Sequence, residues 1–412
     1  MDIQRIKING YKNLDNVNIS FDKLTSLVSV NNYGKSNFLT GIIFGLRFIK
    51  ENEINKKIMM EQVISRPLNR HSRLDLFSFE MEFSYQNKII EYGYSFSWLD
   101  AKIKSEFLNV KDDSQKFMTY VKRDNVAYYK PSITAPCQKK IKVEDNELVI
   151  NKLKAFDTLF YSNVIKEINQ INMYIDRHFD VERSYGLMPV NRSEESSLQY
   201  NLANDNNIPM ILCDIKKLYP KKYNLIINTF KDLFSSIKEM EALEVDAKIS
   251  PTFNNGNPIG KFYTIAIIDK NINQPIDFNL MSDGARKILI VLTNLVLAEI
   301  NHYSLVAIEE LENSLNPKIL QEYLIALNHF VSHVKIIITS HSPYLVNYLP
   351  PQNIYLGLPN DFGLAIFSKV KDNMINKMMS NAEKLNMYVG DYLFDLMSGG
   401  EEEVQQIKKY VE

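Results

Sequence analysis

The segment from Ser29 to Ser36 combines residue types that can hold a phosphate group. It follows the pattern G-x-x-x-x-G-K-[ST] at every position except the first, where serine replaces glycine. In this pattern backbone N–H groups converge on an anion at a helix N-terminus, the lysine reaches the β- and γ-phosphates, and the hydroxyl holds Mg²⁺. The alternative is an accidental Gly-Lys-Ser sequence in an ordinary capped turn.

Two adjacent carboxylates, Glu309 and Glu310, follow the apolar run Leu305 to Ile308. At the carboxyl end of a buried strand, one carboxylate can orient Mg²⁺ while the next polarises an attacking water molecule. Aspartate is usual at the metal-binding position, so Glu309 extends the ligand by one methylene group. The alternative is a solvated acidic turn.

Two further segments could contact phosphate. Ser282 and Gly284 stand at the expected start of a helix, where a free hydroxyl and backbone N–H groups can bind an anion. The alternative there is a plain N-cap, with Ser282 capping the helix and Asp283 in its first turn. His341 follows the apolar run Ile336–Ile338, so it can face a phosphate at the edge of a sheet, or be an ordinary loop histidine.

The elements around these residues predict an α/β fold. The phosphate segment lies between an apolar strand that begins at Leu24 and apolar residues at helical spacing from Phe38 to Ile49. Strands and helices alternate from 262 to 339, which favours a largely parallel sheet. Clean alternation over Phe77–Phe83 and Ile90–Phe96, around a turn at Gln86, predicts an antiparallel hairpin.

The segment between these parts is expected to be mainly helical. Apolar residues recur at helical spacing over Leu153 to Ile175 and over Tyr223 to Met240. We therefore predict four regions: an N-terminal lobe (1–124), a helical insertion (125–244), a C-terminal lobe (245–350) and an extension (351–412).

The composition excludes few classes of function, but it indicates a cytoplasmic protein. The 48 basic and 49 acidic residues give a net charge of -1, so DNA binding would need a local basic patch. Cys137 and Cys213 are far apart and are expected to be ordinary thiols in a reducing cytoplasm. The longest apolar-rich stretch, Ile288 to Ile300, is too short to span a bilayer, so no membrane role is expected.

Taken together and in this order, the motifs resemble the nucleotide-binding head of ABC-type ATPases, in the SMC/RecF/OLD-like branch. The run Asn31–Asn37 is similar to that branch's phosphate loop, and Met281–Arg286 resembles its signature sequence. The run Glu309–Pro317 resembles its Walker B and D-loop segment, and Thr339–Pro343 its switch-histidine segment. The resemblance covers roughly residues 1–125 and 245–350. It implies an ABC-type P-loop head with an antiparallel β subdomain and a helical insertion between the lobes.

The resemblance also implies roles for individual residues. Glu310 would be the general base and His341 the γ-phosphate sensor, with Lys35 as a further catalytic group. Mg²⁺ would be held by Ser36 and Glu309. ATP would be contacted by the loop of one subunit and by the signature turn of a second: Asn31, Asn32, Tyr33, Gly34, Lys35, Ser36, Asn37, Ser282, Gly284 and Arg286.

These roles imply an ATP-hydrolysing enzyme that forms a head-to-head homodimer, or a higher oligomer, when ATP binds. Soluble relatives without coiled coils suggest a sensor that controls a separately encoded effector, such as a nuclease or toxin, in antiphage defence. One alternative is a RecF-like repair ATPase that binds DNA through basic clusters such as Lys139–Lys142, or Lys216 and Lys217 with Lys221 and Lys222. Another is a scaffold that binds nucleotide without hydrolysing it, because Ser29 and Glu309 depart from the usual motifs.

Overall fold

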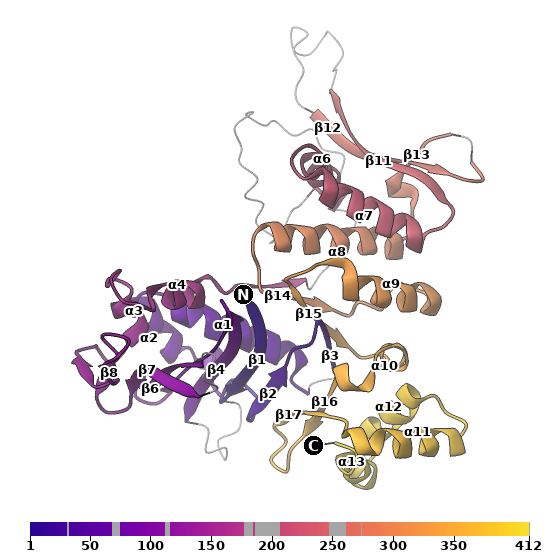
Figure 1. Ribbon diagram of the computed structural model, residues 1–412. Coiled ribbons are helices and arrows are strands. Elements are labelled where there is room, and N and C mark those ends of the chain that lie inside the picture. Colours follow the sequence, from indigo (N-terminus) through magenta and orange to yellow (C-terminus); the bar gives the residue numbers. More distant parts are fainter. Residues whose placement is uncertain are drawn as a thin grey trace. The chain divides into compact units, whose positions relative to one another are not determined.

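The chain forms two compact units (Figure 1). The computed structural model describes residues 1–30, 33–67, 75–111, 116–176, 184–185, 207–246, 261–272 and 274–411. The first unit comprises Met1–Ile175, Ser304–Ala307 and Lys335–Glu412, and the second comprises Asp176–Tyr303 and Ile308–Val334. The two units interleave along the chain, so the four regions expected from the sequence stay a prediction.

The first unit contains an antiparallel eight-stranded sheet in the order β2-β1-β4-β5-β6-β7-β8-β9. The expected hairpin is its centre: β4 and β5 pair along their whole length, and Gln86 and Asn87 turn the chain with positive φ. The strands are β1 (Asp2–Asn9), β2 (Val17–Ser20), β4 (Leu76–Tyr85), β5 (Lys88–Ser97), β6 (Lys102–Lys111), β7 (Phe117–Arg123), β8 (Ala127–Tyr129) and β9 (Lys139–Ile141).

A second sheet has six strands in the order β10-β14-β15-β3-β16-β17. In its centre β15 and β16 both run parallel to β3, and β17 is antiparallel to β16. The strands are β3 (Leu24–Val28), β10 (Met173–Asp176), β14 (Leu305–Glu309), β15 (Lys335–Ser340), β16 (Ile354–Pro359) and β17 (Ala365–Lys369). The last residues of β14 belong to the second unit.

The helix α1 (Lys35–Lys50) joins both sheets into one hydrophobic core. Phe48 stacks on Tyr94 of β5 with ring centroids 4.9 Å apart, and Phe38 lies 6.1 Å from Phe367 of β17. A Cβ built at Gly45 would lie 2.2 Å from the ring of Phe79, so only glycine lets α1 approach β4 this closely. Burying an aromatic side chain contributes about 1.5–3 kcal/mol, so α1 is held firmly on both faces.

Short helices complete the first unit. They are α2 (Glu53–Glu61), α3 (Val149–Leu153), α4 (Ser162–Gln170), α10 (Pro343–Tyr348), α11 (Ile375–Lys384), α12 (Val389–Ser398) and α13 (Glu401–Lys408). The continuous helical pattern expected from Leu153 to Ile175 is wrong in part, because α4 ends at Gln170 and Met173 begins β10. This strand lies at the edge of the six-stranded sheet, and pairing there overrides the local apolar spacing.

The α-helices of the second unit with described bounds are α6 (Ile208–Leu218), α7 (Pro220–Leu233), α8 (Asp283–Ile300) and α9 (Pro317–Phe330). Its sheet is antiparallel, with β11 (Ile237–Asp246), β12 (Lys261–Asp269) and β13 (Ile276–Asp277). The helix expected over Tyr223 to Met240 is wrong at its end, since α7 stops at Leu233. The physical reason is that Met240 and Ala242 are buried while the glutamates beside them face outward, which is the period of a strand.

No helix in the described part of the chain is both long enough and apolar enough to cross a bilayer.

A buried carboxylate ties β6 to α3 in the first unit. Glu106 is 1% exposed and accepts hydrogen bonds from the backbone N–H groups of Val149 (2.6 Å) and Ile150 (3.1 Å) and from the Tyr92 hydroxyl (3.2 Å). Burial raises the pKa of Glu106 from 4.5 to about 7. The folded state therefore holds this proton more tightly than the unfolded state.

We predict that this proton makes stability depend on pH. Its contribution to the free energy of unfolding is fully present below pH 4.5, falls as the pH rises, and is lost above about 7. The loss should amount to roughly 3 kcal/mol. Glu106→Gln should flatten this slope, measured by urea unfolding at several pH values between 4.5 and 7.5. Glu61→Gln, which removes an exposed carboxylate of α2, is the control; a slope in Glu106→Gln that equals that of the wild type would refute the assignment.

Candidate functional site

The phosphate segment has the expected strand–loop–helix arrangement. β3 ends at Val28, and α1 begins at Lys35 directly after Gly34, which has a φ of +83°. This left-handed conformation favours glycine because other residues bring Cβ close to the backbone. Asn31 and Asn32, which were expected to contact the nucleotide, lie outside the described residues. Tyr33 is half-buried.

Gly34 packs against parts of the chain that are far away in sequence. A Cβ built on it would lie 2.6 Å from Cβ of Ala365 and 3.1 Å from Leu14. Asn13 fixes the same region, because its side-chain oxygen accepts a hydrogen bond from Asn37 (2.8 Å) and its backbone oxygen accepts one from the N–H of Ala365 (2.7 Å). The loop is therefore braced by the turn after β1 and by the start of β17.

The ammonium group of Lys35 is the charged centre of this site. Lys35 is 6% exposed, and its Nζ donates to the backbone oxygen of Ser29 (2.8 Å) and to the Ser29 hydroxyl (2.7 Å). It also lies 3.1 Å from Nδ1 of His341. The carbonyl oxygen of Val30 is further away, at 3.4 Å. The structure thus brings together two predicted catalytic residues, Lys35 and His341.

The strand register explains why His341 reaches the loop. β15 runs parallel to β3 with Ser340 opposite Val28, so the residues that follow the two strands meet at one edge of the sheet. A lysine ammonium can only donate hydrogen bonds, so Nδ1 of His341 is the acceptor and the proton of the neutral ring lies on Nε2. His341 is exposed.

Ser36 occupies the second position of α1 and is exposed. A hydroxyl and a carboxylate are hard oxygen ligands of the kind that Mg²⁺ prefers, so Ser36 and Glu309 fit the chemistry expected of a metal site. No group of three or more His, Cys, Asp or Glu side chains in the described ranges could hold a metal by itself.

In the second unit, the loop after β14 orients Glu310. Glu310 has a φ of +54° and an exposed side chain, whose Oε2 accepts a hydrogen bond from the amide nitrogen of Asn313 (2.6 Å). The backbone N–H of Asn313 also donates to the carbonyl oxygen of Glu310 (3.1 Å). An exposed carboxylate held by one neighbour can accept a proton from a water molecule. Glu309 is half-buried at the end of the strand.

The turn at Ser282 is the N-cap of α8. Its hydroxyl oxygen accepts a hydrogen bond from the backbone N–H of Ala285 (3.3 Å), and Arg286 donates to Asp283 in the first helical turn (2.5 Å). A Cβ built at Gly284 would lie 2.2 Å from the carbonyl oxygen of Ser314. The signature-like turn therefore packs directly on the loop that follows Glu310, and the capping role does not exclude a ligand at the same N-terminus.

Two contacts at these sites were not predicted from the sequence. The first is the hydrogen bond between Lys35 and the Ser29 hydroxyl; the only signal was that serine replaces glycine in the motif. The second is the bond from Asn313 to Glu310, signalled by their spacing of three residues. Lys35 and His341 belong to the first unit, whereas Glu309, Glu310, Ser282, Gly284 and Arg286 belong to the second.

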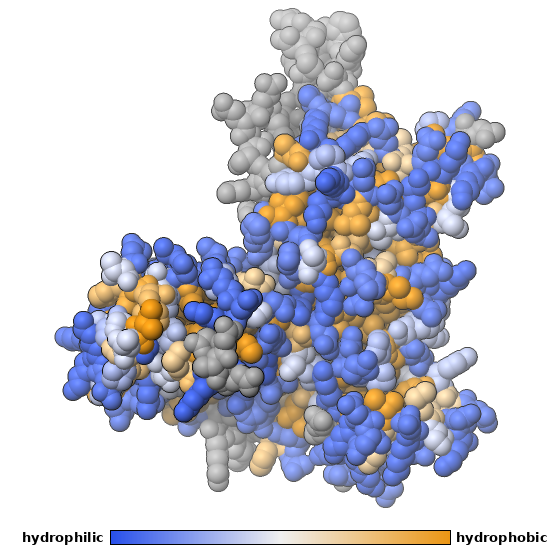
Figure 2. All heavy atoms as spheres, in the orientation of Figure 1, coloured by the Kyte–Doolittle hydropathy of each residue, from blue (hydrophilic) through white to orange (hydrophobic). Residues whose placement is uncertain are grey.

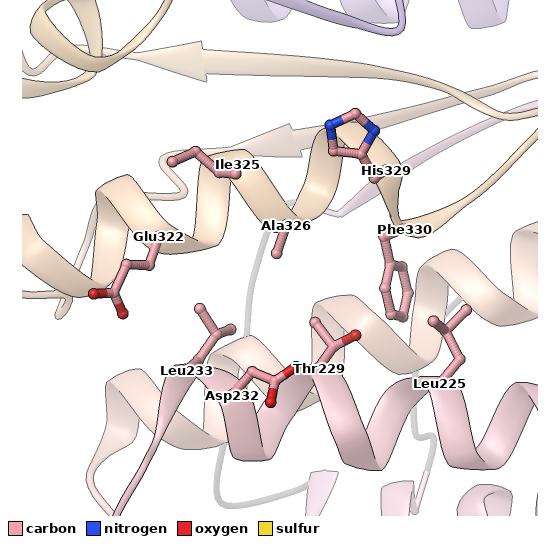
Figure 3. Close-up of a pocket in the computed structure, with 9 residues that line it drawn as sticks. All are labelled: Leu225, Thr229, Asp232, Leu233, Glu322, Ile325, Ala326, His329 and Phe330. Carbon is pink, nitrogen blue, oxygen red and sulfur yellow. The ribbon is translucent and has the colours of Figure 1, made fainter.

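A cleft of about 460 Å³ lies between α7 and α9 in the second unit (Figure 3). Leu225, Leu233, Ala326 and Phe330 give it an apolar floor, and Figure 2 shows apolar atoms at the surface where α7, α8 and α9 lie. Its remaining lining residues are Thr229, Asp232, Glu322, Ile325 and His329. None of the nine residues is among those that the sequence motifs single out, and the cleft has no phosphate-binding loop.

Residues 1–346 match the family model described as AAA ATPase domain. This match spans most of the chain and confirms the expected ABC-type, SMC/RecF-like head with its antiparallel β subdomain. No match was found among curated proteins.

Solved structures of similar fold include the SMC head domain from Thermotoga maritima, with 11% sequence identity, a TM-score of 0.46, and coverage of 90% of this chain and 100% of that one. An SMC head bound to the C-winged helix domain of ScpA shares 13% identity with a TM-score of 0.48, covering 92% of this chain and 100% of that one. A third structure is an SMC head domain with an extended coiled coil, bound to the C-terminal domain of ScpA derived from Pyrococcus furiosus. It shares 11% identity with a TM-score of 0.46, and the match covers 93% of this chain and 99% of that one.

The packing at Gly34 leads to a prediction about the loop. Gly34→Ala and Gly363→Ala both place a side chain at positive φ, but a Cβ at Gly363 meets nothing within 4 Å. Gly363→Ala should therefore lower the free energy of unfolding by only about 1–2 kcal/mol. Gly34→Ala should lower it by roughly 2 kcal/mol more, because Ala365 and Leu14 must move. Urea unfolding of both variants measures the difference, and equal losses would show that Gly34 is not closely packed.

Proposed function

Because the chain belongs to the AAA ATPase domain family, we propose that it hydrolyses ATP at a site built on the loop at Lys35, and that ATP binding joins two copies head to head. The observation that carries this proposal is the contact between Lys35 and His341 at the helix N-terminus. A cation and a histidine ring in contact with each other beside the N-terminus of α1 form a site for the terminal phosphates of a nucleotide.

The proposed roles divide the reaction among few groups. Mg²⁺, held by Ser36 and Glu309 together with phosphate oxygens, would neutralise charge on the nucleotide. Lys35 would break at least one of its hydrogen bonds within the protein and bind the β- and γ-phosphates instead. The Nε2–H group of His341 would donate a hydrogen bond to the γ-phosphate. Glu310, oriented by Asn313, would accept the proton of the attacking water molecule.

The second subunit would complete the site. Ser282 and the first N–H groups of α8, with Arg286 nearby, would close over the γ-phosphate of the partner. The Ser282 hydroxyl accepts one hydrogen bond within its own helix and can still donate its proton to a phosphate oxygen. ATP would shift the equilibrium toward the dimer because it contacts both subunits only in the closed state.

The control of a separate effector in antiphage defence remains a prediction supported by the resemblance. The DNA-binding alternative is weakened by the charges around one of its two basic clusters, the one formed by Lys216, Lys217, Lys221 and Lys222. Lys216 and Lys217 lie 2.5 Å from Glu241 and Glu244 respectively, and Lys222 pairs with Glu299. Lysines already neutralised by carboxylates release few counterions on binding DNA.

The proposal predicts that ATP turnover depends on Lys35 and Glu310 in different ways. Lys35→Ala should weaken ATP binding by about tenfold or more, through the loss of charge-assisted hydrogen bonds. Glu310→Gln should leave binding intact but lower kcat by about a hundredfold or more. Glu322→Gln, an exposed glutamate of α9 changed in the same way, is the matched control and should keep the wild-type rate.

Two measurements check these outcomes. Phosphate release gives kcat and KM, and sedimentation with and without ATP gives the dimer fraction, which should be largest for Glu310→Gln. If wild type and Glu310→Gln bind ATP but share the same negligible rate, the protein is a nucleotide-gated scaffold. If neither variant nor wild type binds ATP, the site proposal itself is wrong.

A further inference from the structure

Ser29 is the residue at which this phosphate loop departs from its motif, and it is fully buried. Its hydroxyl donates to the carbonyl oxygen of Val30 (2.8 Å) and accepts from Nζ of Lys35 (2.7 Å). A glycine at this position would have no side chain to accept that bond. The hydroxyl is thus an additional partner for the lysine, beyond the backbone oxygens that any phosphate loop offers.

The space for this side chain comes from β16. A Cβ built at Gly357 would lie 2.8 Å from Cβ of Ser29, and β16 runs parallel to β3 with Leu356 opposite Val28. A larger residue at 357 would therefore collide with Ser29 or displace it. Serine in the loop and glycine in the neighbouring strand fit each other, which places the hydroxyl firmly against Lys35.

An ammonium group has three N–H donors. Within 3.1 Å, Lys35 faces three acceptors: the Ser29 carbonyl oxygen, the Ser29 hydroxyl and Nδ1 of His341. Each donor therefore has a partner in the protein, and a phosphate can be bound only if Lys35 gives up at least one of them. Without the Ser29 hydroxyl, Lys35 would lose the shortest of these three contacts (2.7 Å), and a phosphate oxygen would have one competitor fewer for the ammonium group.

We propose that Ser29 is a positioning residue that holds the Lys35 ammonium in the nucleotide-free protein and thereby raises the ATP concentration needed to fill the site. This inference rests on the proposed function. The hydroxyl stabilises the protein without ATP (the free state) more than the protein with ATP (the bound state). In the bound state, one or more N–H groups of the lysine must donate to the phosphates instead. A group that stabilises only the free state lowers ligand affinity by the same factor.

The test removes the hydroxyl and keeps Cβ against Gly357. In Ser29→Ala, the dissociation constant for a non-hydrolysable ATP analogue with Mg²⁺ should fall about fivefold, the net value of one such hydrogen bond. Steady-state ATP hydrolysis should show the same factor in KM. The nucleotide-free protein should melt at a lower temperature than the wild type, since it has lost the bond to Lys35.

Ser26→Ala is the matched control. Ser26 lies in the same strand and is also fully buried, but its hydroxyl has no hydrogen-bond partner among the described residues. It should leave the dissociation constant unchanged. Ser29→Gly, which restores the motif, serves as a second variant if Ser29→Ala folds poorly, and it should also bind the analogue more tightly than wild type.

The outcomes separate this inference from the function on which it rests. Unchanged or weaker binding in Ser29→Ala and Ser29→Gly, with normal binding by the wild type, would show that the hydroxyl does not compete with phosphate. A wild type that fails to bind the analogue at all, together with every variant, would overturn the proposed function instead. Tighter binding by both Ser29 variants but not by Ser26→Ala supports the inference.

Discussion

The site depends on one buried charge, the ammonium group of Lys35. An ammonium group shielded from water must have hydrogen-bond acceptors around it, because burying an unpaired charge is far more costly than losing a surface contact. The protein supplies those acceptors from the end of β3 and from His341. The residues that fix the geometry of the loop therefore also determine how readily the lysine can exchange these uncharged acceptors for a phosphate.

The position of that charge is fixed by the core beneath it. α1 carries Lys35 at its first residue, and the same helix is packed between the antiparallel and the parallel sheets by its aromatic face. The hydroxyl of Tyr94 donates to the carbonyl oxygen of Gly45 (2.9 Å), which anchors the helix to β5 with a hydrogen bond as well as by packing. Because interiors are close-packed and deform little, a helix held on two faces keeps its N-terminus in place.

The parts of this architecture that rest on local patterns were predictable from the sequence. The turn at Gly34, the helix after it and the hairpin of β4 and β5 follow from glycine placement and from apolar periodicity, which act over a few residues. The start of β11 was missed, because its pairing with β12 outweighs a helical spacing that continues past Leu233. The bond between Ser29 and Lys35 was also missed, since it depends on Gly357, a residue more than three hundred positions away in the chain. Local periodicity contains no information on burial and packing between distant segments. The phosphate-loop motif could therefore be recognised in the sequence, whereas the hydrogen bond between Ser29 and Lys35 could not.

The second unit contains a comparable local constraint. The absence of a side chain at Gly284 lets the carbonyl oxygen of Ser314 approach the start of α8, and the same loop holds Glu310 through Asn313. In the proposed dimer the turn at Ser282 would cover the ATP of the partner, whereas Glu310 would act on the ATP of its own subunit. Because Gly284 and Ser314 are in such close contact, the turn at Ser282 cannot move without moving the loop that holds Glu310. The two nucleotide sites of such a dimer would therefore be linked through a few backbone atoms of one chain, with no need for a long path through the core.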